Sequence, residues 1–338
     1  MSTPQAGGGR FRAYALFVAA VLYFFLARSL AHRGTLGLAS GAWRPLAEQA
    51  VLVFLLLLGN AGIGSWLDRQ MHPIREQGLP LRQGWTREAG LGLAVGWSLA
   101  VVCVLPMVAV GGIAIVLVLQ PAAWGWLAAD AAFFALAAMA EEIAFRGYGF
   151  QRFEQAVGPI GATLGFAAFY AIVESQAPGS NRASIAVSVA LGLVLSTAYL
   201  RTRALWLSWG INFGWKASRA LIFGLTVSGV NSHSPVVQGD PMGPFWLTGG
   251  GYGLDGSRIA FVALIVSLPV VFRVTRELNF RYNAPVIVPA GIPVDLDAAA
   301  RRQHEAAMGV VEPAAPTLVR ILPVASTPQP NPEPPAAE

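Results

Sequence analysis

The sequence predicts an all-α polytopic membrane protein with about eight transmembrane helices in one bundle. The first observation is composition: 55% of the 338 residues are hydrophobic and 12% are charged, whereas soluble domains carry about 25% charged residues. The second is the recurrence of apolar runs that are each long enough to cross a bilayer. The third is a single cysteine, Cys103, which leaves no internal disulfide. Together they exclude an ordinary soluble domain, a disordered chain and a disulfide scaffold.

Eight apolar segments are candidates for the spanning helices. In chain order they are residues 11–31, 47–67, 90–119, 123–145, 159–175, 183–200, 203–226 and 258–274. The first apolar run has roughly 20 residues, longer than the apolar core of a signal peptide, so we expect it to remain as a helix. The third is long enough to tilt or to carry an interfacial end. The fourth and seventh contain charged residues.

The arginines predict the orientation of these helices. With a cytoplasmic N-terminus, thirteen arginines lie on the cytoplasmic side: Arg10, Arg12, Arg69, Arg75, Arg82, Arg87, Arg146, Arg152, Arg201, Arg203, Arg273, Arg276 and Arg281. Four lie on the far side: Arg33, Arg44, Arg182 and Arg258. The positive-inside rule therefore places both termini in the cytoplasm. It also explains the net charge of +5 without a nucleic-acid partner.

Three regions follow from these patterns. Residues 1–84 hold the N-terminal transmembrane helices and a cytoplasmic loop, and residues 85–275 form the intramembrane domain. Residues 276–338 form a cytoplasmic tail rich in Pro and Ala, which we expect to be mostly disordered. All four histidines (His32, His72, His233 and His304) lie outside the apolar runs, so no metal or other cofactor is expected.

The first group of ionisable residues inside the apolar segments lies in AMAEEIAFRGYGF, residues 138–150. Such residues are costly in a membrane and mark either function or a buried ion pair. Glu142 and Arg146 are four residues apart and can pair on one helix face. Glu141 points about 100° away and is free to face another helix. Asp130, eleven residues earlier, shares the face of Glu141.

Two further groups lie later in the chain. Glu174 ends the fifth apolar segment, where an interfacial role is the alternative to a functional one. The seventh segment carries a polar stripe at spacings of four, four and three: Ser208, Asn212, Lys216 and Arg219. Ser208 and Asn212 are also consistent with hydrogen bonding between helices. Lys216 is harder to explain in that way, because it is the chain's one lysine.

The run EEIAFRG (141–147) resembles the EExxxR motif of the CAAX-protease and bacteriocin-processing family of intramembrane endopeptidases. The segment AYLRTRALWLSWGINFGWK (198–216) is similar to the helix in which that family carries a histidine and, four residues later, an asparagine. The segments 223–229 and 246–257 resemble those that follow it. The resemblance covers roughly residues 85–275.

The resemblance implies a base, Glu141, that activates water for attack on a peptide bond, with Glu142 and Arg146 as its scaffold. Histidines and an asparagine would position the water and stabilise the oxyanion. This sequence has Asn212 at the second histidine and Lys216 at the asparagine. Alignment on the following Pro-Gly places Glu174 at the first histidine, whereas alignment on Phe166 places Tyr170 there.

Three functions are compatible with these residues. The first is a divergent intramembrane peptidase acting on a membrane-associated peptide or protein. The second is a catalytically inactive relative that binds membrane peptides or partner helices, and the third is a transporter or proton path. We expect a multi-pass protein of the bacterial cytoplasmic membrane. We also expect Lys216 to form an intramembrane ion pair with Glu141 or Glu174, because two unpaired charges in a span are costly.

Overall fold

The computed structural model describes residues 5–38, 41–278, 286–287 and 293–294, and the statements below concern these residues. It divides into two units, Met1–Ala284 and Pro285–Glu338. In the second unit, β3 (Val286–Ile287) pairs antiparallel with β4 (Pro293–Val294). The tail predicted for residues 276–338 lies largely outside the described residues.

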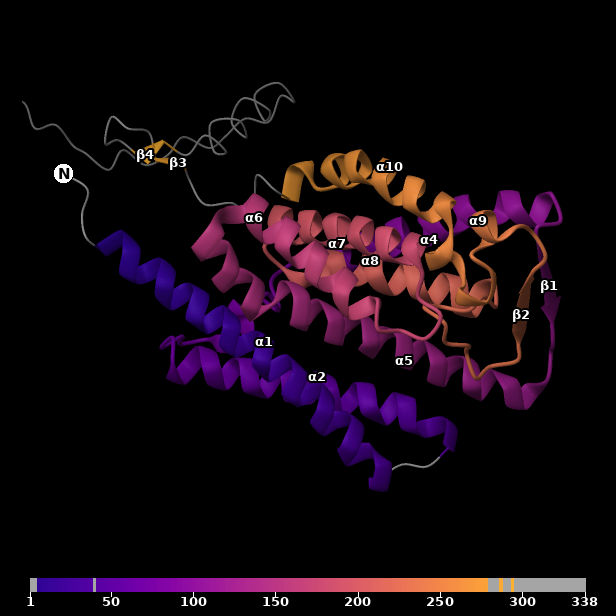
Figure 1. The fold of residues 1–338 in the computed structure, drawn as a ribbon, viewed down its shortest axis with the longest axis horizontal. Coiled ribbons are helices and arrows are strands. Elements are labelled where there is room, and N and C mark those ends of the chain that lie inside the picture. Colours follow the sequence, from indigo (N-terminus) through magenta and orange to yellow (C-terminus); the bar gives the residue numbers. More distant parts are fainter. Residues whose placement is uncertain (1–4, 39–40, 279–285, 288–292, 295–338) are drawn as a thin grey trace, which may run out of the picture. The chain divides into compact units, whose positions relative to one another are not determined.

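The first unit is a bundle of long helices (Figure 1). The long helices are α1 (Gln5–Leu38), α2 (Arg44–Trp66), α4 (Trp85–Ala109), α5 (Pro121–Arg146), α6 (Tyr148–Glu174), α7 (Arg182–Thr202), α8 (Leu205–Ala217) and α10 (Arg258–Val274). Short elements connect them: η1 (Gly41–Trp43), α3 (Pro73–Glu76), β1 (Ile113–Leu117), the π-helical turn η2 (Ser218–Ile222), β2 (Val237–Pro241), α9 (Phe245–Thr248), η3 (Gly250–Tyr252) and η4 (Leu254–Gly256). Figure 1 shows α7 and α8 in the middle of the unit, with α2 and α10 towards opposite sides.

Five segments of the described chain are long and apolar enough to cross a membrane: Gly9–Gly37, Gly41–Trp66, Trp85–Ala109, Ala123–Glu174 and Arg182–Thr202. The fourth contains both α5 and α6, which meet at Gly147. The helices α8 and α10 have 13 and 17 residues and are not among the five. The predicted all-α membrane bundle is confirmed, while the number of eight spans stays a prediction.

The predicted helix over 90–119 is wrong in its last third. The helix α4 ends at Ala109, and Ile113–Leu117 instead forms strand β1, which pairs antiparallel with β2. Gly111 has φ +75°, a left-handed conformation that ends a helix at little cost only for glycine. The β-branched residues beyond it find their hydrogen bonds on β2, a partner more than a hundred residues away.

Two other predicted segments differ from the observed helices in their boundaries. The segment predicted over 203–226 is helical as α8 only to Ala217 and continues as the π-helical turn η2. The segment predicted over 159–175 is the second part of α6, which begins earlier, at Tyr148. Gly158 breaks α6 with φ 84° and ψ 169°, so the predicted start at Pro159 coincides with this kink.

Close packing of α4 on α8 fixes the position of the polar stripe. Gly92 and Gly96 of α4 lie against Gly210 and Gly214 of α8, a small-xxx-small pattern on both helices. A Cβ atom on Gly92 would lie 2.2 Å from the carbonyl oxygen of Leu207. Because these positions admit only glycine, the two backbones touch and α8 is held at the centre of the unit.

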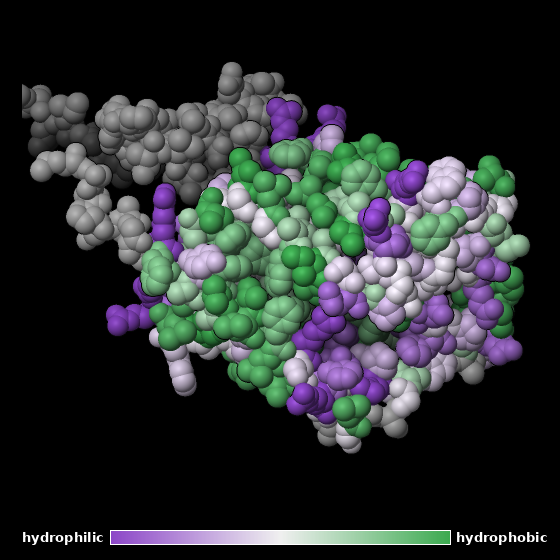
Figure 2. Space-filling model, viewed as in Figure 1, coloured by the Kyte–Doolittle hydropathy of each residue, from purple (hydrophilic) through white to green (hydrophobic). Residues whose placement is uncertain are grey.

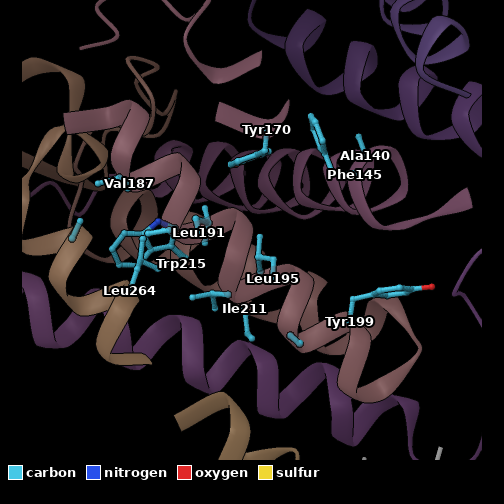
Figure 3. Close-up of a cluster of buried hydrophobic side chains, with 14 of the residues drawn as sticks. Ala140, Phe145, Tyr170, Val187, Leu191, Leu195, Tyr199, Ile211, Trp215 and Leu264 are labelled. Atoms are coloured by element: carbon cyan, nitrogen blue, oxygen red, sulfur yellow. The ribbon is translucent and has the colours of Figure 1, made fainter. Parts of the chain in front are cut away.

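The hydrophobic core surrounds this central helix. Figure 3 shows buried side chains from α5, α6, α7, α8 and α10 meeting there: Ala140, Phe145, Tyr170, Val187, Leu191, Leu195, Tyr199, Ile211, Trp215 and Leu264. On the outside, Figure 2 shows a broad apolar area across one face, with hydrophilic side chains gathered beside it. An apolar exterior of this kind is suited to lipid contact.

Candidate active site

The helix α5 places the two adjacent glutamates in different surroundings. Glu142 and Arg146 form an ion pair of 3.3 Å, and both side chains are fully buried. Arg146 also donates a hydrogen bond of 3.5 Å to the carbonyl oxygen of Gly192 on α7. Its guanidinium lies 5.3 Å from the ring centroid of Tyr170 on α6. The pairing predicted from the i, i+4 spacing is thus present, and it ties α5 to α6 and α7.

Glu141 turns away from this pair and meets α6 and α8. Its Oε1 forms an ion pair with the Lys216 ammonium. Its Oε2 accepts hydrogen bonds from the Tyr170 hydroxyl at 3.2 Å and from the Asn212 amide at 2.9 Å. The same amide donates to Glu142 Oε1 at 3.1 Å, so Asn212 bridges the two glutamates. Of the two partners expected for Lys216, the structure selects Glu141.

The polar stripe of the seventh segment faces the interior of the bundle, as predicted. Ser208, Asn212, Lys216 and Arg219 are all buried. Asn212 and Lys216 contact Glu141, and Ser208 lies within reach of Glu142. The Ser208 hydroxyl donates to the carbonyl oxygen of Leu205 within α8, and Arg219 turns towards a loop described below.

A cavity of ≈ 350 Å³ borders the glutamate and the lysine. Its charged lining consists of Glu141, Glu174, Lys216 and, on α1, Arg28. Much of the remaining wall is apolar and includes Phe24, Leu52, Phe133, Phe134 and Phe145. The side chains of Glu141 and Lys216 retain 19% and 9% exposure, so this ion pair is accessible from the cavity.

The structure places the two candidates for the first histidine differently. Tyr170 contacts Glu141 directly, whereas Glu174, one turn later at the end of α6, lines the cavity. Both therefore belong to the same site. The six predicted site residues (Glu141, Glu142, Arg146, Glu174, Asn212 and Lys216) all lie at or directly behind this cavity.

A buried cluster on the loop side was missed by the sequence reasoning. Arg219 Nη1 lies 2.6 Å from Asp255 Oδ1, and the Trp215 indole donates to the same oxygen at 3.3 Å. Asp255 Oδ2 accepts hydrogen bonds from the backbone and the hydroxyl of Ser228, which lines the cavity. Burial alone would raise the pKa of Asp255, but the Arg219 guanidinium outweighs it and holds that pKa below its usual range. The sequence feature that could have indicated this cluster is an acidic residue, Asp255, within the Gly-rich run 246–257.

Asp130 does not join the site. Its carboxylate accepts a hydrogen bond of 2.7 Å from the backbone of Ser234 and lies 3.0 Å from His233 Nδ1. It therefore fixes the loop that follows η2, although it lies on the same helix as Glu141. Across the described residues, no group of three or more His, Cys, Asp or Glu side chains is arranged to hold a metal ion.

This arrangement can support acid–base chemistry on a molecule bound in the cavity. A carboxylate beside a cavity can accept a proton from water. An ammonium at the wall of the same cavity can stabilise a developing negative charge on a carbonyl oxygen. The Glu142–Arg146 pair lies next to Glu141 on α5, fully buried and away from the cavity.

Comparison with known proteins agrees with the motif. Residues 123–218 match the family described as type II CAAX prenyl endopeptidase Rce1-like. The matched range contains α5 with both glutamates, α6, α7 and α8 with Asn212 and Lys216. No curated protein and no solved structure matches the chain. The resemblance inferred from EExxxR is confirmed over this range, and the chain is an integral membrane protein with an Rce1-like segment.

Proposed function

We propose that this protein is a divergent intramembrane endopeptidase that hydrolyses a peptide bond of a membrane-associated substrate with a water molecule activated by Glu141. One observation carries the proposal: Glu141 and Lys216, from two helices of the Rce1-like segment, meet at the wall of one cavity, with Asn212 buried behind Glu141. The Rce1-like match supports a peptide substrate.

The ion pair with Lys216 represents the resting arrangement in this mechanism. When a substrate carbonyl enters the cavity, the ammonium moves from Glu141 Oε1 to the carbonyl oxygen. Glu141 then takes a proton from water, and the resulting hydroxide attacks the carbonyl carbon. Lys216 stabilises the tetrahedral oxyanion, while the Asn212 amide remains hydrogen-bonded to Glu141 and Glu142. Glu141 passes its proton to the leaving nitrogen as the C–N bond breaks.

Peptide cleavage by the purified full chain in detergent tests this function. We expect turnover of members of a peptide library, and Glu141→Gln should reduce it by about 100-fold or more, the size typical of losing a general base. Glu76→Gln, an exposed carboxylate on α3 that does not line the cavity, is the matched control. Turnover that survives Glu141→Gln would contradict the proposed base.

A second candidate function is binding of membrane peptides or partner helices without hydrolysis. It is favoured by the hydrogen bonding of Glu141, whose two oxygens already receive three donors and have little capacity left to accept a proton from water. An ionised carboxylate offers about four lone-pair sites. Peptide binding with no turnover, unchanged in Glu141→Gln, would favour this candidate over the first.

The proposed topology has both termini in the cytoplasm and follows from the arginine count. The helices of the first unit alternate in direction, so the turns after α2, α5 and α7 lie at one end, as the eight-span arrangement requires (Figure 1). A reporter fused after Arg281 should be cytoplasmic and one inserted within residues 231–245 should be on the far side. Both reporters on one side would contradict the arrangement.

A further inference from the structure

Arg28 lies on the cavity wall but takes no part in the cluster around Glu141. It belongs to α1 and lines the cavity together with Gln49 of α2. The side chain is exposed, and it has no hydrogen bond or ion pair with the residues that the structure describes. An arginine within a membrane-crossing helix is unfavourable unless an anion or the interface solvates it. Its guanidinium is therefore available to a ligand from outside the described residues.

The position of Arg28 within the candidate span of α1 indicates the kind of ligand. The candidate span of α1 ends at Gly37, and Arg28 lies nine residues before it, about 13 Å along the helix. Gln49 lies at nearly the same depth, eight residues into the candidate span of α2 that starts at Gly41. The headgroup layer of a bilayer is about 5–7 Å thick on each side. A long arginine side chain at this depth reaches the level of the lipid phosphates.

The surroundings of the two residues are open to lipid. Exposed apolar side chains flank them on the same two helices: Leu26, Leu30 and Phe54. Inside the cavity, Phe24 and Leu52 continue this apolar surface from the same two helices. His32, one turn after Arg28 on α1, contacts Glu48, the residue before Gln49 on α2, at 3.3 Å, which holds the two helices together near Arg28.

We propose that Arg28 and Gln49 bind the phosphate group of a phospholipid, with an acyl chain along the apolar wall formed by Phe24 and Leu52. The guanidinium fork matches two phosphate oxygens, and the Gln49 amide supplies a further donor. The site goes beyond the proposed peptidase function, because it uses neither Glu141 nor Lys216. It places a lipid in the part of the cavity that α1 and α2 line, beside the ion pair.

The test compares two lipids with the same acyl chains, added to the full chain in a neutral detergent. Phosphatidylglycerol carries the phosphate and diacylglycerol lacks it. Phosphatidylglycerol should raise the Tm of the unmodified protein by about 3–6 °C at saturation, and diacylglycerol should raise it by much less. Arg28→Gln should abolish the difference between the lipids. Arg33→Gln should preserve it, because Arg33 is an exposed arginine of α1 that does not line the cavity.

Native mass spectrometry gives a second measurement that does not depend on thermal stability. The unmodified protein and Arg33→Gln should retain one phosphatidylglycerol that Arg28→Gln loses. Equal retention in Arg28→Gln would overturn the proposal. If inorganic phosphate stabilised the protein equally, and this depended on Arg28, the site would bind free anions instead. The same result with a short peptide carboxylate would identify a peptide site. Either result would overturn the lipid assignment. Peptide turnover is not part of the readout, so failure here leaves the proposed function intact.

Discussion

Glu141 and Glu142 are adjacent in sequence, and each forms an ion pair, yet the two pairs differ in surroundings. The Glu142–Arg146 pair is formed within α5 and has no exposure. The Glu141–Lys216 pair joins α5 to α8 and borders a cavity. A pair without exposure cannot touch a bound ligand, whereas a pair at a cavity wall can, so only the second is in a position to contact one.

The largest effect is expected for the fully buried pair. Arg146→Met leaves Glu142 as an unpaired buried charge and should lower the free energy of unfolding by about 3–5 kcal/mol. Thermal unfolding in detergent measures it, with the exposed Arg87→Met as control. The double variant Arg146→Met with Glu142→Leu should recover much of the loss. No recovery would mean that Arg146 acts through Gly192 and Tyr170 instead of Glu142.

A smaller loss is expected at the cavity pair. Lys216→Met should cost about 1–3 kcal/mol, because Glu141 keeps its hydrogen bonds to Tyr170 and Asn212 and remains partly exposed. Adding Glu141→Gln should restore part of the Tm, whereas adding Glu174→Gln should not. Rescue by Glu174→Gln alone would show that Lys216 pairs with Glu174 in the membrane.

The hydroxyl of Tyr170 is expected to contribute less. Tyr170→Phe removes one hydrogen bond to Glu141 Oε2 and should cost about 0.5–1.5 kcal/mol of stability. Tyr14→Phe, on the exposed face of α1, is the matched control. If the peptidase mechanism holds, kcat should fall more than KM changes, since the hydroxyl orients the base. Equal Tm values for the two variants would remove Tyr170 from the site.

The contribution of the Arg219–Asp255 ion pair to stability should change only at acidic pH. The pKa of Asp255 is lower in the folded protein than in the unfolded chain. Its contribution to stability is therefore complete above the unfolded pKa, about 4, and is lost as the pH falls through the lower folded pKa. The Tm of the unmodified protein should fall more steeply below about pH 4 than that of Asp255→Asn. Parallel profiles would contradict the low pKa.

What the sequence determined follows from interactions between residues close in the chain. Apolar runs predicted the bundle and most of its helices, because each span must bury its own backbone polar groups. The four-residue spacing predicted the Glu142–Arg146 pair and the interior face of Asn212 and Lys216. The EExxxR run led to the family resemblance that residues 123–218 confirm.

Only the tertiary structure decided which helices meet. It selected Glu141 over Glu174 as the partner of Lys216, brought Tyr170 to the same carboxylate and joined Arg219 to Asp255. Residues 113–117, which were predicted to be helical, form a strand, because their hydrogen-bonding partners lie on β2. The sequence contained one further signal, the paired glycines of α4 and α8, whose meaning depends on their facing each other. Contacts between distant segments depend on how the helices pack. A local sequence pattern can identify one residue of such a contact but not its partner.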